Sequence, residues 1–368
     1  MTQFRLLART RQVTEYSCGA CALQAVMSYW GKNVGESELM KVLHTTSEEG
    51  TYPENIVRGA QALGFEAEAR DHLTLEEVER FTSEGAPMIA LVQAWRSEKG
   101  SLESAAEDWD NGHYIVVLGV DKDYVYFEDP YARMSKAFMP RDTFVDHWQQ
   151  VMGGNLQKNP KLMQLGIFVR GSQAAAGATT PRVRLADLDF GRFGSLNLMV
   201  TKFSRPIPPY DFLNELKNIW EKGQMRADAF IFLRKDKSGR ISGMEGSSLQ
   251  DGDDIASIDA FISVLTSRSL GVPELARTKA EAAVAMAAAG DFGLSANDMQ
   301  ALGQKLQPNE SAIVILFENV WERRFREVAQ ARGGEVLNQR LISPQALAEA
   351  AGRLNAHAKG LPDVAPLA

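Results

Sequence analysis

The stretch Gln12–Trp30, QVTEYSCGACALQAVMSYW, has the pattern of a short polar loop that runs into a helix, with Cys18 at the junction. The N–H groups of a helix's first turn and the helix dipole favour a thiolate over a thiol at this place. Gly19 and Ala20 add little bulk, so a substrate backbone has room beside the sulfur. Gln12 stands six residues before Cys18, where its amide can reach an oxyanion on an attacked carbonyl. The stretch therefore predicts a nucleophilic cysteine.

A nucleophilic cysteine needs a base, and the base needs a group that orients it. Of the five histidines, His113 alone opens a continuous apolar strand, GHYIVVLGVD, after a polar loop. Asp129 follows sixteen residues later, at the end of the next predicted strand, YVYFEDPY. Two antiparallel neighbours joined by a turn at residues 121–123 would place His113 and Asp129 side by side. We therefore predict Cys18 as nucleophile, His113 as base, Asp129 as orienter and Gln12 as oxyanion donor.

These residues, in this order and with Gly19 and Pro130 beside them, resemble the C39 peptidase family over roughly residues 1–170. The family consists of papain-like bacterial cysteine peptidases, many fused to ABC transporters, which cleave leader peptides after a double glycine. The resemblance implies hydrolysis of a peptide bond in a peptide or protein substrate, with a Gly-Gly leader as the expected recognition element. The sequence departs from the family at Ser17, where many members carry Asp, and no transporter sequence follows.

Other interpretations of the same residues remain open. Cys18 alone is also compatible with a small buried apolar residue. Cys18-x-x-Cys21 matches a thioredoxin-like redox motif, although no βαβ pattern surrounds it. The domain is also compatible with a catalytically silent peptide-binding module, or with a thiol acyltransferase or glutamine deamidase that uses the same triad. Only the mass of a reaction product separates the last two from a peptidase.

Composition excludes several classes of function. The formal net charge of −7 and the lack of a basic patch with interleaved aromatic residues argue against nucleic-acid binding. Two cysteines in 368 residues fit a reducing compartment. The sequence has no signal peptide and no apolar run of about 20 residues that could span a membrane, so we expect a cytoplasmic protein. No Walker motif, dinucleotide fingerprint or zinc spacing is present, so we expect no cofactor and no metal.

The fold class expected from the order of elements is α+β, with helices first and strands after them. We predict a peptidase domain at residues 1–170, a linker at 171–193, a second α+β domain at 194–355 and a tail at 356–368. Within the first domain, the predicted elements that matter below are a helix at 38–43 capped by Ser37, helices at 52–63, 75–81 and 141–151, and a strand at 165–170 that closes the sheet.

Residues 194–355 are similar to a family of bacterial domains of unknown function, through DAFIFLRKDKSGRI, DFGLSANDMQALGQKLQPNESAIVILFENV and GGEVLNQRLISPQALAEA. The strand and helix pattern suggests ferredoxin-like units, and we expect this domain to bind a protein partner. Two features of the first half also bear on function. The acidic insert at residues 96–112 has the composition of a solvated surface loop, and its charge could also attract a basic substrate segment. Gly153-Gly154 fits an ordinary helix C-cap and turn, and it is also a pair of the kind that the C39 family cleaves.

Overall fold

The computed structural model describes residues 10, 12–94, 111–131, 136–151, 161–171, 196–206, 226–246 and 296–333, with a few positions between 208 and 218. Its helices are α1 (Cys18–Tyr29), α2 (Glu36–Val42), α3 (Pro53–Ala62), α4 (Leu75–Ser83), α5 (Arg141–His147), α9 (Ala296–Gly303) and α10 (Val320–Ala331). Its strands are β1 (Glu66–Arg70), β2 (Met88–Gln93), β3 (Gly112–Val120), β4 (Tyr124–Glu128), β5 (Lys136–Pro140), β6 (Gln149–Val151), β7 (Lys161–Met163), β8 (Gly166–Arg170), β9 (Leu196–Phe203), β10 (Arg226–Lys235), β11 (Ile241–Gly246) and β12 (Glu310–Glu318).

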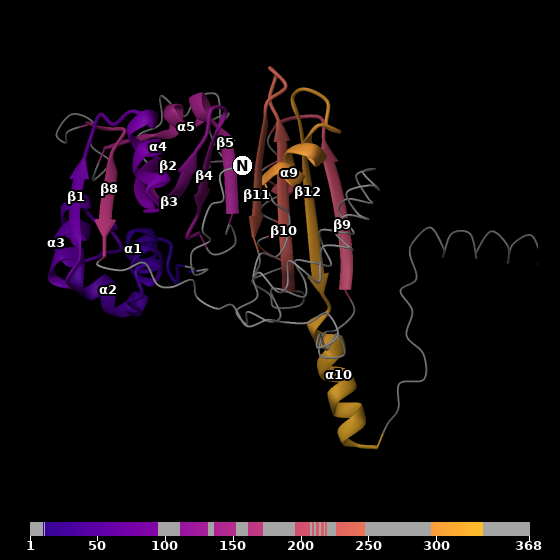
Figure 1. Cartoon of the computed structure of the whole chain (residues 1–368). Helices are drawn as coiled ribbons and strands as arrows, with labels where there is room; N and C mark the ends of the chain where they lie inside the picture. Colours follow the sequence, from indigo (N-terminus) through magenta and orange to yellow (C-terminus); the bar gives the residue numbers. More distant parts are fainter. Residues whose placement is uncertain are drawn as a thin grey trace, which may run out of the picture. The chain divides into compact units, whose positions relative to one another are not determined.

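Ten of these strands form one sheet in the order β1-β8-β2-β3-β4-β5-β11-β10-β12-β9, and the pairs are antiparallel. β8 thus lies between β1 and β2, although it follows β2 by more than seventy residues in the chain. β6 and β7 form a separate two-stranded ribbon. Figure 1 shows the strands and helices of the described segments. The mixture of helices with an antiparallel sheet confirms the predicted α+β class at this level.

β2 and β3 are buried on both faces of the sheet, and their successive side chains point to opposite faces. Ile89 and Leu91 pack in one cluster with residues of α1 and α3, together with Tyr114 and Val116 of β3. Their neighbours Met88, Ala90, Ile115 and Val117 pack in a second cluster with residues of α4 and α5. β2 is accordingly buried along its whole length, which explains the unbroken apolar run of its first five residues, 88–92.

Helix starts follow local sequence signals where the signal is strong. α4 begins with a capping box, in which the Thr74 side chain accepts the Glu77 N–H and the Glu77 carboxylate accepts the Thr74 N–H. α3 has Pro53 at its first position, where a missing N–H costs nothing. Both helices match the predicted ranges within two residues.

Two predicted helices were wrong at one end. α2 begins at Glu36 with Gly35 as its N-cap, two residues before the predicted start after Ser37, because the buried Glu36 side chain accepts the backbone N–H of Val13. The helix predicted at residues 141–151 ends at His147, and Gln149–Val151 pairs with β7 instead. Strand pairing with β7 has overridden the helical pattern in this second case.

The described strands after residue 195 continue the sheet. β10 pairs with both β11 and β12, and β12 pairs with β9. β11 pairs with β5 through Gly243 opposite Phe138, and Phe138 packs with Ile231 and Leu233 of β10. Residues 321–368 form a separate compact unit, of which α10 and the two residues after it are described.

Several sequence predictions fall on residues that are not described. They include most of the acidic insert, the pair Gly153-Gly154, and residues 172–193 of the linker. The domain boundaries, the ferredoxin-like pattern and the family resemblance of residues 194–355 remain predictions. None of the helices that the structure describes is long and apolar enough to cross a membrane.

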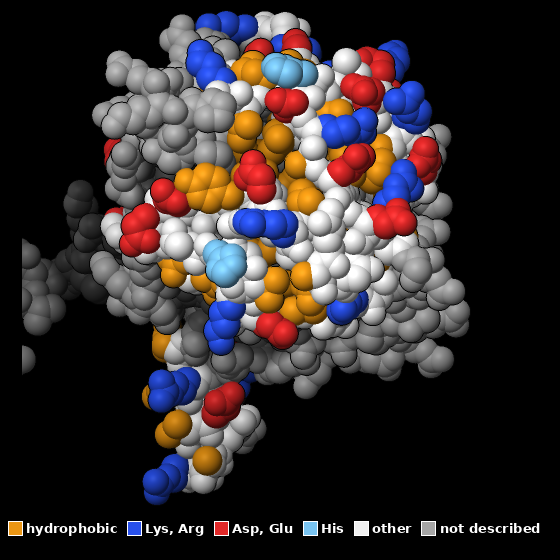
Figure 2. Space-filling view, turned by 90° about the vertical axis from the view of Figure 1, so that its left-hand side faces the viewer, with side chains coloured by type: hydrophobic (Ala, Val, Ile, Leu, Met, Phe, Trp, Pro, Cys, Tyr) orange, Lys and Arg blue, Asp and Glu red, His pale blue; other side chains and the backbone are white. Residues whose placement is uncertain are grey.

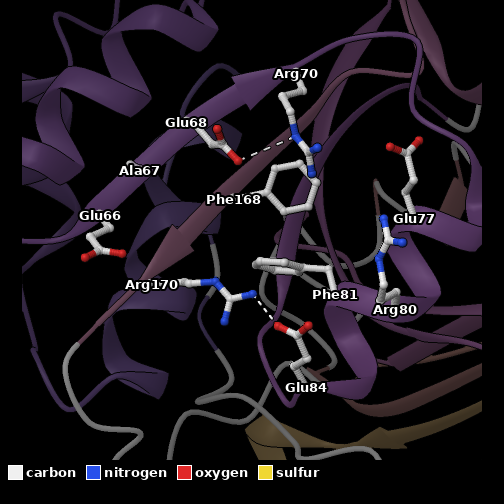
Figure 3. Close-up of a pocket in the computed structure, with 10 residues that line it drawn as sticks. All are labelled: Glu66, Ala67, Glu68, Arg70, Glu77, Arg80, Phe81, Glu84, Phe168 and Arg170. Atoms are coloured by element: carbon white, nitrogen blue, oxygen red, sulfur yellow. Dashed lines mark hydrogen bonds and ion pairs between the residues drawn. The ribbon is translucent and has the colours of Figure 1, made fainter.

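A groove of about 420 Å³ lies between β1, β8 and α4. Figure 3 shows its lining, in which Arg70 stacks on Phe168 and Arg170 stacks on Phe81, with guanidinium carbons 4.4 and 4.5 Å from the ring centroids. Glu84 pairs with Arg170 at 2.5 Å. Figure 2 shows the molecule from the side that carries α3 and β1, where positive and negative side chains alternate over the described surface. The Arg170–Phe81 stack joins β8 to α4, whereas the Arg70–Phe168 stack joins β1 to β8. None of the four predicted site residues lines this groove.

A chain that ends at Gly171 is expected to fold cooperatively and to keep its reactive thiol. The two clusters that hold α1 to α5 on the sheet contain Met244 as their only described core residue beyond this point. The truncation exposes Phe138 and leaves β5 as a free edge strand, so we expect self-association, and Phe138→Lys should reduce it. Thermal unfolding and size-exclusion chromatography provide the measurements. A fragment without a cooperative transition, with or without this substitution, would show that the two halves share one core.

Candidate active site

The structure brings the four predicted site residues into buried positions. Cys18 is the first residue of α1, His113 is the second residue of β3, and Asp129 follows the last residue of β4. Gln12 lies in the loop before α1. Their exposed fractions are 8% for Cys18, 7% for Gln12, 7% for His113 and 3% for Asp129. A charged or reactive group buried to this degree needs partners nearby, and the hydrogen bonds show which ones it has.

His113 and Asp129 form a hydrogen bond of 2.6 Å between Nε2 and Oδ1. The β3–β4 pairing sets Val116 opposite Glu128, and continuing this register puts Asp129 diagonally across from His113. Asp129 Oδ1 also accepts the backbone N–H of Tyr131 at 2.8 Å, which fixes the carboxylate. Because Nε2 is engaged by Asp129, Nδ1 is the ring nitrogen that remains for the Cys18 thiol.

The thiol of Cys18 carries a lowered pKa. Burial by itself would raise the pKa of this thiol, since it disfavours the charged form. The hydrogen bond and positive charge of His113, together with the backbone N–H of Tyr114, outweigh burial and hold the pKa below its ordinary value. The first intrahelical bond of α1 runs from Cys21 N to Ser17 O, so the N–H groups before it point beyond the helix end.

The imidazole of His113 carries the opposite shift. Burial opposes its protonation, but the charge of the Asp129 carboxylate and its hydrogen bond, with a contribution from Cys18, raise the pKa of His113 to about 10. The two groups also reinforce each other, because a thiolate and an imidazolium stabilise each other. Both shifts favour a thiolate–imidazolium pair, which is the reactive state of a nucleophilic cysteine.

Cys21 lies one turn further along α1, and the pKa of its thiol is shifted in the opposite direction. It is fully buried, and burial raises the pKa of its thiol well above the ordinary value. Both cysteines are free, so Cys18 and Cys21 do not form the disulfide that a thioredoxin-like redox motif would contain in its oxidised state. The two thiols of one helix turn thus form an internal comparison of an activated and an inert cysteine.

Iodoacetamide at neutral pH is expected to alkylate Cys18 at least about tenfold faster than Cys21, because one unit of thiol pKa changes the thiolate population tenfold below the pKa. The measurement is a time course of alkylation in the native full chain, with the two sites resolved by peptide mass spectrometry. Unfolding the chain in denaturant serves as the control, since it should make the two rates equal. A native preference for Cys21 would contradict the activation of Cys18.

Gln12 is held beside the site by both its backbone and its side chain. Its backbone N–H donates to Pro130 O at 2.8 Å, which ties the loop to the residue after Asp129. Its Nε2 donates to Thr14 O at 2.8 Å, and its buried Oε1 has no hydrogen-bond partner. Because the Thr14 carbonyl oxygen can only accept a hydrogen bond, the amide atom that faces it must be the Gln12 nitrogen. The second N–H of that nitrogen is the one available to an oxyanion.

Two residues that sequence reasoning did not assign hold this loop in place. Glu36 accepts the backbone N–H of Val13 at 3.0 Å. The Ser17 hydroxyl accepts the Thr14 N–H and donates to the Thr14 carbonyl, both at 3.1 Å. A hydroxyl can do both, whereas an ionised aspartate only accepts, so Ser17 closes the loop in a way that an aspartate cannot. A glutamate at a helix start carries no sequence signal for such a role.

Gly19 shows why the residue after Cys18 has no side chain. A Cβ atom at this position would lie 2.9 Å from Thr51 Cβ and 3.1 Å from Tyr114 Cδ2. The Tyr114 hydroxyl in turn donates to Thr51 O at 2.9 Å. The first turn of α1 therefore packs directly on β3 and on the segment before α3, which places Cys18 against the residue next to His113.

Comparison with known proteins finds matches to the part of the chain that carries this site. Residues 7–153 match the model of the Peptidase C39 family, which confirms the resemblance predicted for the first half of the chain. The transport/processing ATP-binding protein ComA of Streptococcus pneumoniae is 30% identical over 141 residues. These residues are 38% of this chain and 17% of that protein, so the chain spans less than a fifth of the length of this relative.

Two solved structures are also similar to the first half of the chain. The peptidase domain of Streptococcus ComA, a bifunctional ABC transporter involved in quorum sensing, is 22% identical with a TM-score of 0.33. The match covers 45% of this chain and 98% of the chain in that structure. A double-glycine-motif protease from an AMS/PCAT transporter, solved with its leader peptide, is 16% identical with a TM-score of 0.32. This match covers 46% of this chain and 94% of the chain in that structure.

Proposed function

Because residues 7–153 match the Peptidase C39 family model, we propose that this part of the chain is a papain-like cysteine peptidase that hydrolyses a peptide bond in a peptide or protein substrate. The observation that carries the proposal is the hydrogen-bonded set of Cys18, His113 and Asp129 inside the matched residues. The opposite pKa shifts of Cys18 and His113 are those that a thiolate nucleophile and its acid–base partner require.

The acylation step follows from the roles of these groups. The Cys18 thiolate attacks the carbonyl carbon of the scissile peptide bond and forms a C–S bond, while the carbonyl oxygen becomes an oxyanion. The Gln12 Nε2–H and the Cys18 backbone N–H are the proposed donors to that oxyanion. His113 gives its proton to the leaving amine nitrogen as the C–N bond breaks. The products are a free amine and a thioester on Cys18.

Deacylation uses the same groups in reverse. His113, now neutral, takes a proton from a water molecule, whose oxygen attacks the thioester carbonyl. The C–S bond then breaks, the carboxylic acid leaves, and the thiolate–imidazolium pair is restored. Asp129 keeps the imidazole in one orientation and stabilises its positive charge throughout both steps.

The family resemblance makes a leader ending in Gly-Gly the first substrate to examine. We also propose a cytoplasmic location, because an activated thiol must stay reduced to react. None of the described residues after residue 195 has a part in this mechanism. The binding of a protein partner by the second half of the chain remains a prediction.

The test is incubation of the full chain with synthetic peptides in which Gly-Gly precedes a varied segment, read by mass spectrometry. Hydrolysis yields two fragments whose summed mass exceeds that of the substrate by one water. The Cys18→Ala variant is the control and should yield none. A library that includes small proteins of diverse sequence guards against a wrong choice of peptide.

Other products would point to the other chemistries. An intact peptide in which a glutamine has become glutamate indicates a deamidase, and a peptide joined to an added amine indicates an acyltransferase. Binding without any product, under conditions in which Cys18 is rapidly alkylated, indicates a silent binding module. Each of these results would overturn the peptidase proposal.

A further inference from the structure

Gln93, the last residue of β2, is only 1% exposed and uses its whole side-chain amide in hydrogen bonds. Its Nε2 donates to Gln149 O at 3.0 Å and to Gln150 Oε1 at 2.5 Å. Its Oε1 accepts the backbone N–H of Asn111 at 3.0 Å. Both amide hydrogens and the carbonyl oxygen are thus engaged, so the side chain has one orientation.

These bonds hold the start of the strand that carries His113. Asn111 comes two residues before His113, and its carbonyl accepts the Ala94 N–H at 2.7 Å. In the β2–β3 pairing, Gln93 lies opposite Gly112 and Val92 lies opposite His113. Asn111 is therefore held by the Gln93 side chain at its N–H and by the chain after Gln93 at its carbonyl.

The Gln150 side chain packs against the backbone of this strand at the next position. A Cβ atom on Gly112 would lie 2.0 Å from Gln150 Nε2, so the amide occupies the space that any larger residue would fill. Gln150 belongs to β6 and is itself buried. The strand start is thus fixed from β2 on one side and from β6 on the other.

His147, at the end of α5, completes the arrangement. Its Nδ1 lies 3.2 Å from the Gln93 carbonyl oxygen, and because a carbonyl only accepts, Nδ1 carries the hydrogen. The backbone and the side chain of Gln93 are therefore both held. A buried side chain whose donors and acceptor are all engaged, as those of Gln93 are, is held in one geometry.

We propose that Gln93 is a positioning residue for His113, acting through Asn111 and Gly112 to set the imidazole between Asp129 and Cys18. The hydrogen bonds of Gln93 go to Gln149, Gln150 and Asn111 and not to Asp129 or Cys18, so its influence is on where the His113 imidazole lies. The imidazole must meet a carboxylate at 2.6 Å and a thiol with its other nitrogen. A displacement of about 1 Å is enough to change reactivity about a hundredfold in such sites. The consequence for peptide turnover rests on the proposed function, whereas the consequence for the thiolate does not.

The experiment measures the rate of Cys18 alkylation by iodoacetamide against pH in the full chain. Gln93→Met keeps the length and bulk of the side chain and removes all of its hydrogen bonds. We expect its alkylation profile to move to higher pH by about one unit, which is about a tenfold lower rate on the acidic limb. Gln150→Met removes one bond only, and we expect a shift in the same direction of a smaller size.

A control separates positioning from general loosening of the fold. Val78→Ala truncates a buried side chain of α4 in the cluster on the sheet and leaves the glutamine network intact. It should lower the thermal midpoint as Gln93→Met does, yet keep the wild-type alkylation profile. If Gln93→Met does not fold, the Gln150→Met profile decides the matter alone.

The outcomes distinguish this inference from the proposed function. A wild-type profile in a folded Gln93→Met or Gln150→Met protein, or an equal shift in Val78→Ala, overturns the positioning role even if peptides are cleaved. A shift confined to the glutamine variants supports the role even if no peptide is ever cleaved.

Discussion

Replacing His113 by alanine is expected to reduce peptide turnover by roughly 10⁴-fold, the product of two losses. Without the imidazolium, burial dominates the pKa of the Cys18 thiol and raises it above the ordinary value, so the thiolate becomes a minor species at neutral pH. The leaving amine also loses its proton donor, which is worth about 10²–10⁴ in rate. Alkylation of Cys18 at neutral pH should fall by about 10–100-fold, because alkylation depends on the thiolate population and needs no proton donor.

The pH profile of wild-type turnover should be bell-shaped. Activity rises with pH as Cys18 ionises through its lowered pKa, and it falls as His113 loses its proton through its raised pKa of about 10. Asp129→Asn should move the alkaline limb to lower pH, because the carboxylate charge raises the pKa of His113. His72→Ala, at an exposed histidine, is the matched control and should leave both limbs in place. If Cys18 is alkylated at the wild-type rate in the His113→Ala protein, that result contradicts the assignment of Cys18 and His113 as a thiolate–imidazolium pair.

Gln12→Ala is expected to lower turnover by roughly 10²–10³-fold, the cost of one lost oxyanion donor. The Michaelis constant should change little, because negative charge on the substrate oxygen develops only in the transition state. Alkylation of Cys18 should stay within a few-fold of wild type, since no carbonyl is attacked in that reaction. The measurements are steady-state kinetics on a cleaved peptide and the alkylation time course on the same protein.

Thermal stability decides between a catalytic and a merely structural Gln12. The bond from Gln12 N to Pro130 O survives in the variant, and the substitution removes both the bond to Thr14 and the buried oxygen that has no partner. The two side-chain effects offset each other, so we expect a stability change of at most about 1 kcal/mol. Parallel losses of stability, alkylation and turnover would instead show that Gln12 only fastens its loop.

The parts of this molecule that sequence reasoning found depend on neighbours in the chain. The start of α1 at Cys18 follows from a polar loop before an apolar helical stripe, and α4 follows from the Thr74–Glu77 pair. His113 and Asp129 meet because the two strands that carry them are joined by a short turn. Such local signals need no knowledge of the remaining fold.

The parts that it missed depend on partners far along the chain. Gln93 and Gln150 are 57 residues apart, and in the sequence each is an ordinary polar residue. Gln150 was expected in a helix, and it becomes a buried partner only because residues 149–151 pair with β7. Glu36 likewise gains its role from contact with Val13. No window of sequence short enough to show periodicity contains both Gln93 and Gln150, or both Val13 and Glu36.

The position of β8 has a consequence for how the chain reaches its native state. β1 and β2 are both complete by residue 93, but each pairs with β8, which ends at residue 170. A chain that grows from its N-terminus must therefore hold two strands without their shared neighbour until that last strand is made. Non-local pairing of this kind slows folding, because the entropy of closing a long loop is lost before the stabilising contacts form. The helix that bears Cys18 packs on Ile167 and Val169 of this strand, so the thiol should become reactive only late in synthesis, after the first half of the chain is complete.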